Sequence, residues 1–267
     1  MNSTWNKILV PDNEFAPSAE LFHENSKLSP NDAPAREDVV RARMARMGET
    51  LSYRGYPAIA LPAPEEPRMP LAKAVEARAT SRKLESTRLP FERLAALLAC
   101  SYGQTRDLRE RGYQRRFRTV PSAGALYPLE IYCHTTHVGE LAAGVYHYHP
   151  IDGVLRLTRK GDETRRLSEA FVQPELPLEA SAIFFITALF ERSTFKYGER
   201  GYRFLLLEAG HVAQNLNLVA TAFGMGVVNV GGFFDDALNE VLGLDGVTHA
   251  VLYAVVVGGA GDERDPA

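Results

Sequence analysis

The residues from Leu205 to Phe223 constrain the fold most, because they predict one long helix between two apolar strands. Apolar side chains recur there at alternating steps of four and three, the spacing of one helix face, and Gly224 follows as a stop. Bulky apolar runs at Ala182–Phe190 and His249–Val257 have the length of buried strands. Helices and strands interleave without a regular βαβ period, which predicts an α+β fold rather than a doubly wound parallel sheet.

The remaining elements follow from the same reasoning. Strands are predicted at Leu129–Thr135, Gly144–Tyr148 and Val154–Thr158, an amphipathic helix at Pro90–Leu98 that stops before Gly103, and a short charged helix at Asp32–Gly48. Prolines crowd the stretch Ala58–Pro70, which predicts an extended connector. We therefore divide the chain into an N-terminal extension, residues 1–66, and a main domain, residues 67–267.

Composition excludes several classes of protein. A formal net charge of −3 gives no general attraction to nucleic acid or to an anionic membrane. The segment Met1–Lys7 lacks the apolar core of a signal peptide, and no apolar stretch reaches transmembrane length. Cys100 and Cys133 each lie in an apolar context and are predicted to be small buried side chains rather than a disulfide. We expect a cytoplasmic protein with no nucleic acid and no membrane as partner.

Two polar features admit more than one interpretation. Six arginines fall within Arg106–Arg118, which predicts a solvated loop or a surface that receives an acidic partner. His147 and His149 share one face of a predicted strand, but no third ligand is identifiable, so we predict no metal site. Glu208, His211 and Asn215 form a polar stripe on the long helix, which is typical of an internal hydrogen-bonded set.

Small residues fill the stretch Pro121–Pro128, which leads into the strand predicted at Leu129–Thr135. A turn built from Ser, Ala and Gly lets backbone N–H groups approach a flat ligand with no bulky side chain in the way. The alternative is a tight turn that only leads the chain into the strand.

Three further segments have a chemical and a structural interpretation. Arg78–Arg82 places two guanidinium groups and two hydroxyls within a short stretch, a donor set for a phosphate or else a solvated basic turn. Gly224–Asp236 is an apolar strand between glycines, which also fits a helix end followed by an ordinary strand. Lys196–Gly198 joins a Lys–Tyr pair to a glycine, which also fits an exposed loop.

These segments, in this order, resemble the nitroreductase-like flavin enzymes, and within them the SagB-type dehydrogenases, which are FMN-dependent thiazoline or oxazoline oxidases. The resemblance covers residues 70–259. Further motifs of that branch are Gly144–Tyr148, Lys196–Arg200 and Gly210–Asn215. The resemblance implies a nitroreductase-like fold, with a central mixed or antiparallel sheet flanked by helices and an N-terminal extension.

The resemblance also implies a cofactor site. It predicts noncovalent FMN rather than FAD or NAD, and only one phosphate-sized cluster of donors is visible. In this family the small-residue turn comes from the partner subunit and closes the far side of the flavin, which implies a homodimer with FMN at its interface. The implied contacts are Arg78, Ala79, Thr80 and Arg82 at the phosphate; Val230, Gly231 and Gly232 beside the ring; and Pro121, Ser122, Ala123, Gly124 and Ala125 on the far side.

The implied reaction converts an azoline to an azole by removing two hydrogens from a peptide natural product, with O₂ as electron acceptor. The flavin performs the redox step, so the protein supplies orientation and a base. We assign Lys196 and Tyr197 to proton abstraction; both are protonated near neutrality when free, so one must be perturbed by its surroundings. The implied partners are an azoline-bearing peptide and a cyclodehydratase or carrier protein.

Two other functions remain open at this point. One is an NAD(P)H-dependent nitro or quinone reductase. The other is a catalytically silent scaffold subunit that docks through Arg106–Arg118.

Overall fold

The computed structural model describes residues 17–31, 33 and 35–261; the segment Met1–Lys7 discussed above lies outside them. Its helices are α2 (Pro17–Asn25), α3 (Glu37–Arg46), α4 (Leu71–Ala77), α5 (Phe91–Tyr102), α6 (Thr164–Ala170), α7 (Glu175–Leu178), α8 (Glu191–Tyr197), α9 (Arg200–Ala222) and α10 (Asp235–Leu242), with single 3₁₀ turns η1 (Arg109–Arg111) and η2 (Ala123–Ala125). Its strands are β1 (Ala58–Ala60), β2 (Leu84–Glu85), β3 (Gln104–Arg106), β4 (Phe117–Arg118), β5 (Leu129–Thr135), β6 (Gly144–His149), β7 (Val154–Lys160), β8 (Ala182–Leu189), β9 (Met225–Val230) and β10 (His249–Ala260).

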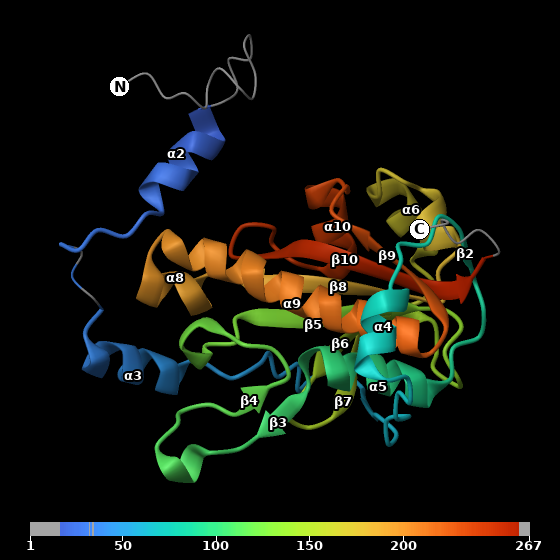
Figure 1. Cartoon of the computed structure of the whole chain (residues 1–267), viewed down its shortest axis with the longest axis horizontal. Coiled ribbons are helices and arrows are strands. Elements are labelled where there is room, and N and C mark those ends of the chain that lie inside the picture. Colours follow the sequence, from blue (N-terminus) through green and yellow to red (C-terminus); the bar gives the residue numbers. More distant parts are fainter. Residues whose placement is uncertain (1–16, 32, 34, 262–267) are drawn as a thin grey trace.

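One antiparallel sheet organises the domain (Figure 1). Its strands run in the order β1-β7-β6-β5-β8-β10-β2, and β9 pairs with β10 as well. Every strand pair within it is antiparallel, which confirms the predicted α+β class and excludes a doubly wound parallel sheet. The strand β1 comes from the proline-rich connector and adds an edge to the sheet beside β7.

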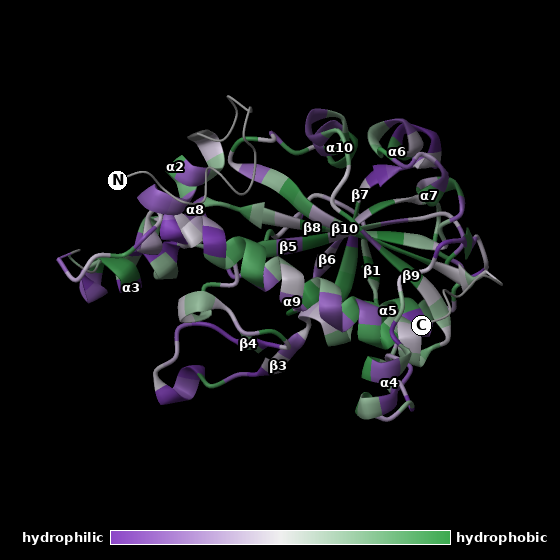
Figure 2. Ribbon diagram, turned by 45° about the horizontal axis from the view of Figure 1, so that its top comes forward, coloured by the Kyte–Doolittle hydropathy of each residue, from purple (hydrophilic) through white to green (hydrophobic). Residues whose placement is uncertain are grey.

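Both faces of the sheet are buried, because the side chains of its central strand alternate between two apolar clusters. In β8, Phe184 and Ile186 pack with α5 and α9, whereas Ile183 and Phe185 pack with α6 and α10. Figure 2 shows α4, α5 and α9 on one side of the sheet and α6, α7 and α10 on the other. The result is a three-layer domain in which the long predicted helix lies across one face.

A buried carboxylate ties the N-terminal segment to this sheet. Glu130 on β5 is 1% exposed and accepts hydrogen bonds from the Thr50 hydroxyl (2.6 Å) and the Leu51 N–H (2.9 Å). It also contacts Arg192 Nη1 at 2.5 Å and His147 Nε2 at 2.6 Å. Burial alone would raise the pKa of Glu130, but Arg192 and His147 hold it well below its ordinary value. Residues 50–51 are therefore part of the core's polar network.

No helix among the described residues has both the length and the apolar character that crossing a bilayer requires.

Candidate functional site

The small-residue turn and the Lys–Tyr pair meet in the structure. Gly124 has φ +62°, and a Cβ placed on it would lie 2.5 Å from Tyr197 Oη and 2.7 Å from Lys196 Nζ. Such distances are far inside van der Waals contact, so a Cβ here would push the ends of both side chains away, and the positive φ also favours glycine. Two segments that are remote in the sequence thus place an amine and a phenol directly on the turn.

The short helix α8 positions this pair. Lys196 and Tyr197 are its last residues, and Gly198 ends it with φ +53°. The Tyr197 ring packs edge-on against Phe204 with centroids 5.0 Å apart, and Lys196 Nζ lies 5.1 Å from the Tyr197 ring centroid. Both side chains are half-buried. The alternative interpretation of this pair as an exposed loop is wrong, because α8 packs against α9.

The turn itself has a strained backbone conformation. Ala125 and Tyr127 have φ of +53° and +48°, in the left-handed region that side chains with a Cβ rarely adopt. The Ser122 hydroxyl accepts a hydrogen bond from the Tyr127 N–H at 2.9 Å. The Tyr127 hydroxyl in turn accepts one from the Arg118 N–H at 3.2 Å. These bonds fix the backbone whose outer residues, Pro121 and Gly124, are exposed.

A buried acid supports the turn from the side of α9. Glu208 is 3% exposed, accepts a hydrogen bond from the Tyr102 hydroxyl at 2.8 Å and is hydrogen-bonded to Ser122. Burial raises the pKa of its carboxyl to about 7, although both hydrogen bonds and the charge of Arg118 oppose the rise. The internal hydrogen-bonded stripe predicted on this helix is confirmed for Glu208, whereas His211 is exposed.

The predicted phosphate donors lie at the start of β9. Arg78 follows the last residue of α4, and Ser81 bonds to Val227 twice: its N–H donates to the Val227 carbonyl at 3.0 Å, and its hydroxyl accepts from the Val227 N–H at 3.0 Å. Arg78 is half-buried, while Ala79, Thr80 and Arg82 are exposed. The donor set is thus presented outward from a backbone anchored to the sheet.

The predicted flavin-facing glycines lie at the other end of the same strand. Val230 is the last residue of β9 and is buried, whereas Gly231 and Gly232 are exposed. A Cβ added to Gly231 would meet only a ring carbon of Tyr253 within 4 Å, at 3.8 Å. β9 has six residues and so spans about 20 Å, a length that suits an extended mononucleotide.

One chain does not bring all predicted site residues together. Lys196 and Tyr197 end α8, which precedes α9, whereas Ser81, within Arg78–Arg82, bonds to the strand that follows α9. α9 has 23 residues and is therefore about 34 Å long. Figure 1 shows α8 and α4 near opposite ends of this helix. The structure defines two half-sites, a β9 half (Arg78–Arg82 with Val230–Gly232) and a turn half (Pro121–Ala125 with Lys196 and Tyr197).

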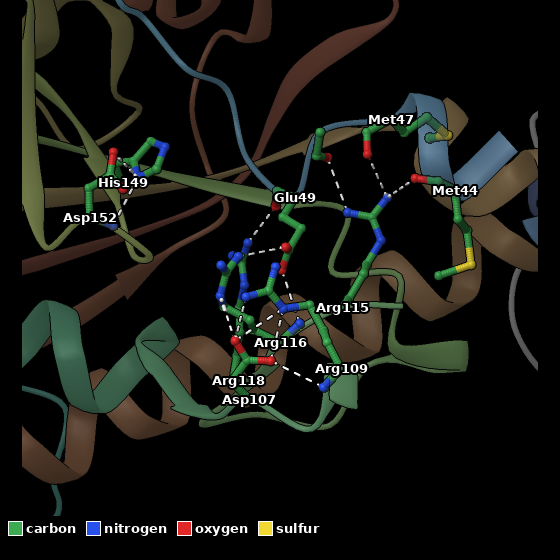
Figure 3. A network of polar contacts seen from close by, with 11 residues as sticks. Met44, Met47, Glu49, Asp107, Arg109, Arg115, Arg116, Arg118, His149 and Asp152 are labelled. Carbon is green, nitrogen blue, oxygen red and sulfur yellow. Dashed lines mark hydrogen bonds and ion pairs between the residues drawn. The ribbon is translucent and has the colours of Figure 1, made fainter. Parts of the chain in front are cut away.

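The basic run is not a solvated loop throughout (Figure 3). Arg115 is 3% exposed and donates to the backbone carbonyls of Met47 and Gly48 at 3.1 Å each. Arg116 pairs with Glu49 at 2.7 Å, and Arg118 is buried. The expectation of a solvated loop is wrong for these residues, because the C-terminal end of α3 supplies acceptors that no local sequence pattern reveals.

A cavity of about 220 Å³ adjoins the turn half. It lies between α3, residues 112–115, the turn residues Gly124 and Ala125, and Lys196. A larger cavity of about 500 Å³, lined by Arg93 and Phe223 among others, contains none of the predicted site residues. The smaller cavity is therefore the one that adjoins the predicted site residues.

Two histidines considered as metal ligands are engaged separately. His147 contacts Glu130, and His149 lies 3.4 Å from Asp152. Within residues 17–31, 33 and 35–261, no group of three or more His, Cys, Asp and Glu side chains could hold a metal ion.

The sequence profile of the Nitroreductase family matches residues 75–259, and the chain belongs to this family. A protein of Methanocaldococcus jannaschii, MJ1384, described as a nitroreductase, is 37% identical over 73% of this chain and 91% of its own length. The microcin B17-processing protein McbC of Escherichia coli is 30% identical over 55% of this chain. That match spans 56% of McbC.

A solved structure shares the fold. A crystal structure from Anabaena variabilis, also described as a nitroreductase, has a TM-score of 0.71 and 28% identity. The similarity covers 91% of this chain and 47% of that one. This likeness confirms the predicted nitroreductase-like fold.

Family membership also confirms the cofactor, because nitroreductase-family proteins bind FMN. The residues present fit this group. Outward-facing Arg and Thr side chains at the start of β9 suit a phosphate, and the uncovered Gly231–Gly232 backbone suits a flat ring.

Proposed function

We propose that the protein is an FMN-dependent dehydrogenase that converts thiazoline or oxazoline rings of a peptide into thiazoles or oxazoles. The observation that carries the proposal is the proximity of the Lys196 amine and the Tyr197 hydroxyl to Gly124. In this proposal the turn covers the flavin, and one of the two side chains acts as the base. The 30% identity to a protein that processes microcin B17 supports a peptide as substrate.

The chain's own residues have distinct tasks in this proposal. Arg78, Thr80 and Arg82 bind the phosphate, and the Gly231–Gly232 backbone lies beside the ring. FMN, when bound, accepts the two electrons and one of the two hydrogens removed from the azoline. Lys196 or Tyr197 takes the other hydrogen as a proton from the ring carbon next to the C=N bond. The adjacent turn keeps water from this side of the site.

The separation of the two half-sites supports a homodimer. The β9 half of one protomer would meet the turn half of its partner, since α9 separates the phosphate donors of one chain from its own turn half. Nitroreductases are commonly dimeric. Two equivalent sites related by a two-fold axis would result.

An alternative function is an NAD(P)H-dependent nitro or quinone reductase, which the description of the 37% identical relative favours. The scaffold alternative would have to use Arg106, Arg109 and Arg111, which are exposed. Arg115, Arg116 and Arg118 are engaged within the chain.

A single assay separates the two enzymatic functions. Purified protein is incubated in air with an azoline peptide and no nicotinamide, and the peptide mass is followed. Loss of two hydrogens with the wild type but not with the Lys196→Ala variant supports the proposal. No loss of mass, together with rapid bleaching of the flavin by NAD(P)H, would establish the reductase instead.

A further inference from the structure

The cavity beside the turn half has an excess of positive charge. Arg41 from α3, Arg115 from the loop after η1 and Lys196 from α8 line it, and Glu37 is the carboxylate among its lining residues. Glu37 is already engaged: it accepts hydrogen bonds from Arg41 Nε at 3.1 Å and Nη2 at 2.5 Å. The cavity is therefore suited to a ligand group that brings negative charge.

A buried donor in the lining lacks an acceptor. Arg115 is 3% exposed, and its terminal nitrogens donate to the backbone carbonyls of Met44, Met47 and Gly48. Its Nε–H has no hydrogen-bond partner among the described residues. Burial lowers the pKa of Arg115 to about 10, so the guanidinium stays charged at neutral pH. Because this Nε atom is itself buried, Arg115 contributes its positive charge to the cavity rather than a new hydrogen bond.

The position and the size of the cavity indicate what it holds. Lys196, Gly124 and Ala125 belong to its wall, so a group bound there adjoins the proposed proton acceptor. Its volume of about 220 Å³ is smaller than a pocket for a whole ligand of drug size, roughly 300–1,000 Å³. It therefore accommodates one part of a substrate, with the remainder outside.

α3 is fixed in place on both sides of this cavity. Its C-terminal carbonyls bind Arg115, and Arg43 pairs with Glu191 on α8 and lies 5.3 Å from the Phe195 ring centroid. These contacts hold α3 by residues other than Arg41. The Arg41 side chain can therefore be replaced without displacing α3 from the wall of the cavity. The N-terminal extension thus contributes a positively charged side chain to the cavity wall.

We propose that this cavity binds a carboxylate of the substrate, through an ion pair with Arg41 and the nearby positive charge of Arg115, and so sets which azoline is presented to Lys196. The carboxylate belongs either to an acidic residue beside the ring or to the C-terminus of the peptide. This proposal rests on the proposed function.

Two pairs of synthetic azoline peptides test it with the FMN-loaded enzyme. One pair differs by Glu or Gln beside the ring, and the other by a free or amidated C-terminus. We expect kcat/KM to be about tenfold or more higher for the carboxylate member of one pair, the effect of a charge-assisted hydrogen bond, and the pair that responds identifies the source. Equal values within both pairs would overturn the proposal.

Variants on α3 test whether Arg41 causes the preference for the carboxylate peptide. Arg41→Gln should remove the preference, mainly through KM for the carboxylate peptide. Arg46→Gln is the matched control: Arg46 is exposed on the same helix and does not line the cavity, so this variant should keep the preference. A preference that survives in Arg41→Gln would also overturn the proposal.

A binding measurement separates this proposal from the proposed function. If none of the peptides is oxidised, the proposed function fails. Fluorescence anisotropy with labelled copies of the same peptides then tests the cavity alone. Tighter binding of the carboxylate peptide to the wild type than to Arg41→Gln supports the carboxylate site, and equal binding overturns it.

Discussion

Replacing Glu208 with Gln should stabilise the protein, by an amount that depends on pH. The carboxyl is buried between α5, α9 and the turn, and its pKa is raised from 4.5 to about 7. At about 1.36 kcal/mol for each pKa unit, this rise corresponds to about 3 kcal/mol.

The direction of this pH dependence follows from the number of protons that the folded and the unfolded chain bind. Below pH 4.5 Glu208 is protonated in both the folded and the unfolded chain, so the carboxyl brings no penalty. Between pH 4.5 and about 7 the unfolded chain releases the proton and the folded chain retains it, so folding becomes less favourable as pH rises. A neutral Gln can still accept from Tyr102 and has no such dependence.

Urea unfolding followed by circular dichroism at fixed protein concentration measures the difference. The free energy of unfolding of the wild type, relative to Glu208→Gln, should fall by about 3 kcal/mol between pH 4.5 and pH 7.5. The exposed Glu76→Gln serves as control and should show no such fall. A difference that stays constant over this range would refute the burial argument.

Three further variants examine the half-sites. Lys196→Ala should purify yellow and lose about 10²–10⁴-fold in turnover, as expected for a positioned base; a colourless protein would make Lys196 a cofactor ligand. Arg78→Ala should weaken FMN retention by about tenfold or more, measured as flavin released on dilution, with Lys83→Ala as the exposed neighbour that should retain it. Gly124→Ala should retain FMN but lose turnover, because its Cβ displaces Lys196 and Tyr197; unchanged turnover would remove the turn from the mechanism.

The strands were the most predictable part of the fold. β5 has the predicted bounds. β8 ends one residue earlier than predicted, and its continuous apolar run is typical of a strand buried on both faces. β10 extends past its predicted end at Val257, through Gly258 and Gly259. There a Cβ would come within 2.9 Å of neighbouring atoms, so these glycines permit close packing rather than ending the strand.

The helix ends were less predictable. α9 begins at Arg200 rather than Leu205, since its first turn contains two arginines and a glycine and lacks the apolar spacing of the rest. Arg200 and Arg203 instead donate hydrogen bonds to Ser26 after α2. The predicted charged helix at Asp32–Gly48 is shorter, at Glu37–Arg46, and Asp32 lies outside the described residues.

The candidate site was predictable in its residues and not in its arrangement. Local motifs indicated Lys196 and Gly124 separately, but only the packing of α8 against the turn brings them together. The raised pKa of Glu208 depends on burial by α5, which no pattern on α9 itself reveals. The proposed division into residues 1–66 and 67–267 stays a prediction; Thr50 and β1 already contact the sheet.

If each site is shared between protomers because α9 separates the phosphate donors from the turn half, two inactive variants can complement each other. In a mixed dimer of Arg78→Ala and Lys196→Ala chains, one site would contain both lesions and the other would contain neither. Coexpression of two inactive chains should then restore activity by complementation, with roughly a quarter of all sites intact when subunits assort at random. Two lesions placed in the same half-site, such as Lys196→Ala and Gly124→Ala, could not rescue each other in this way.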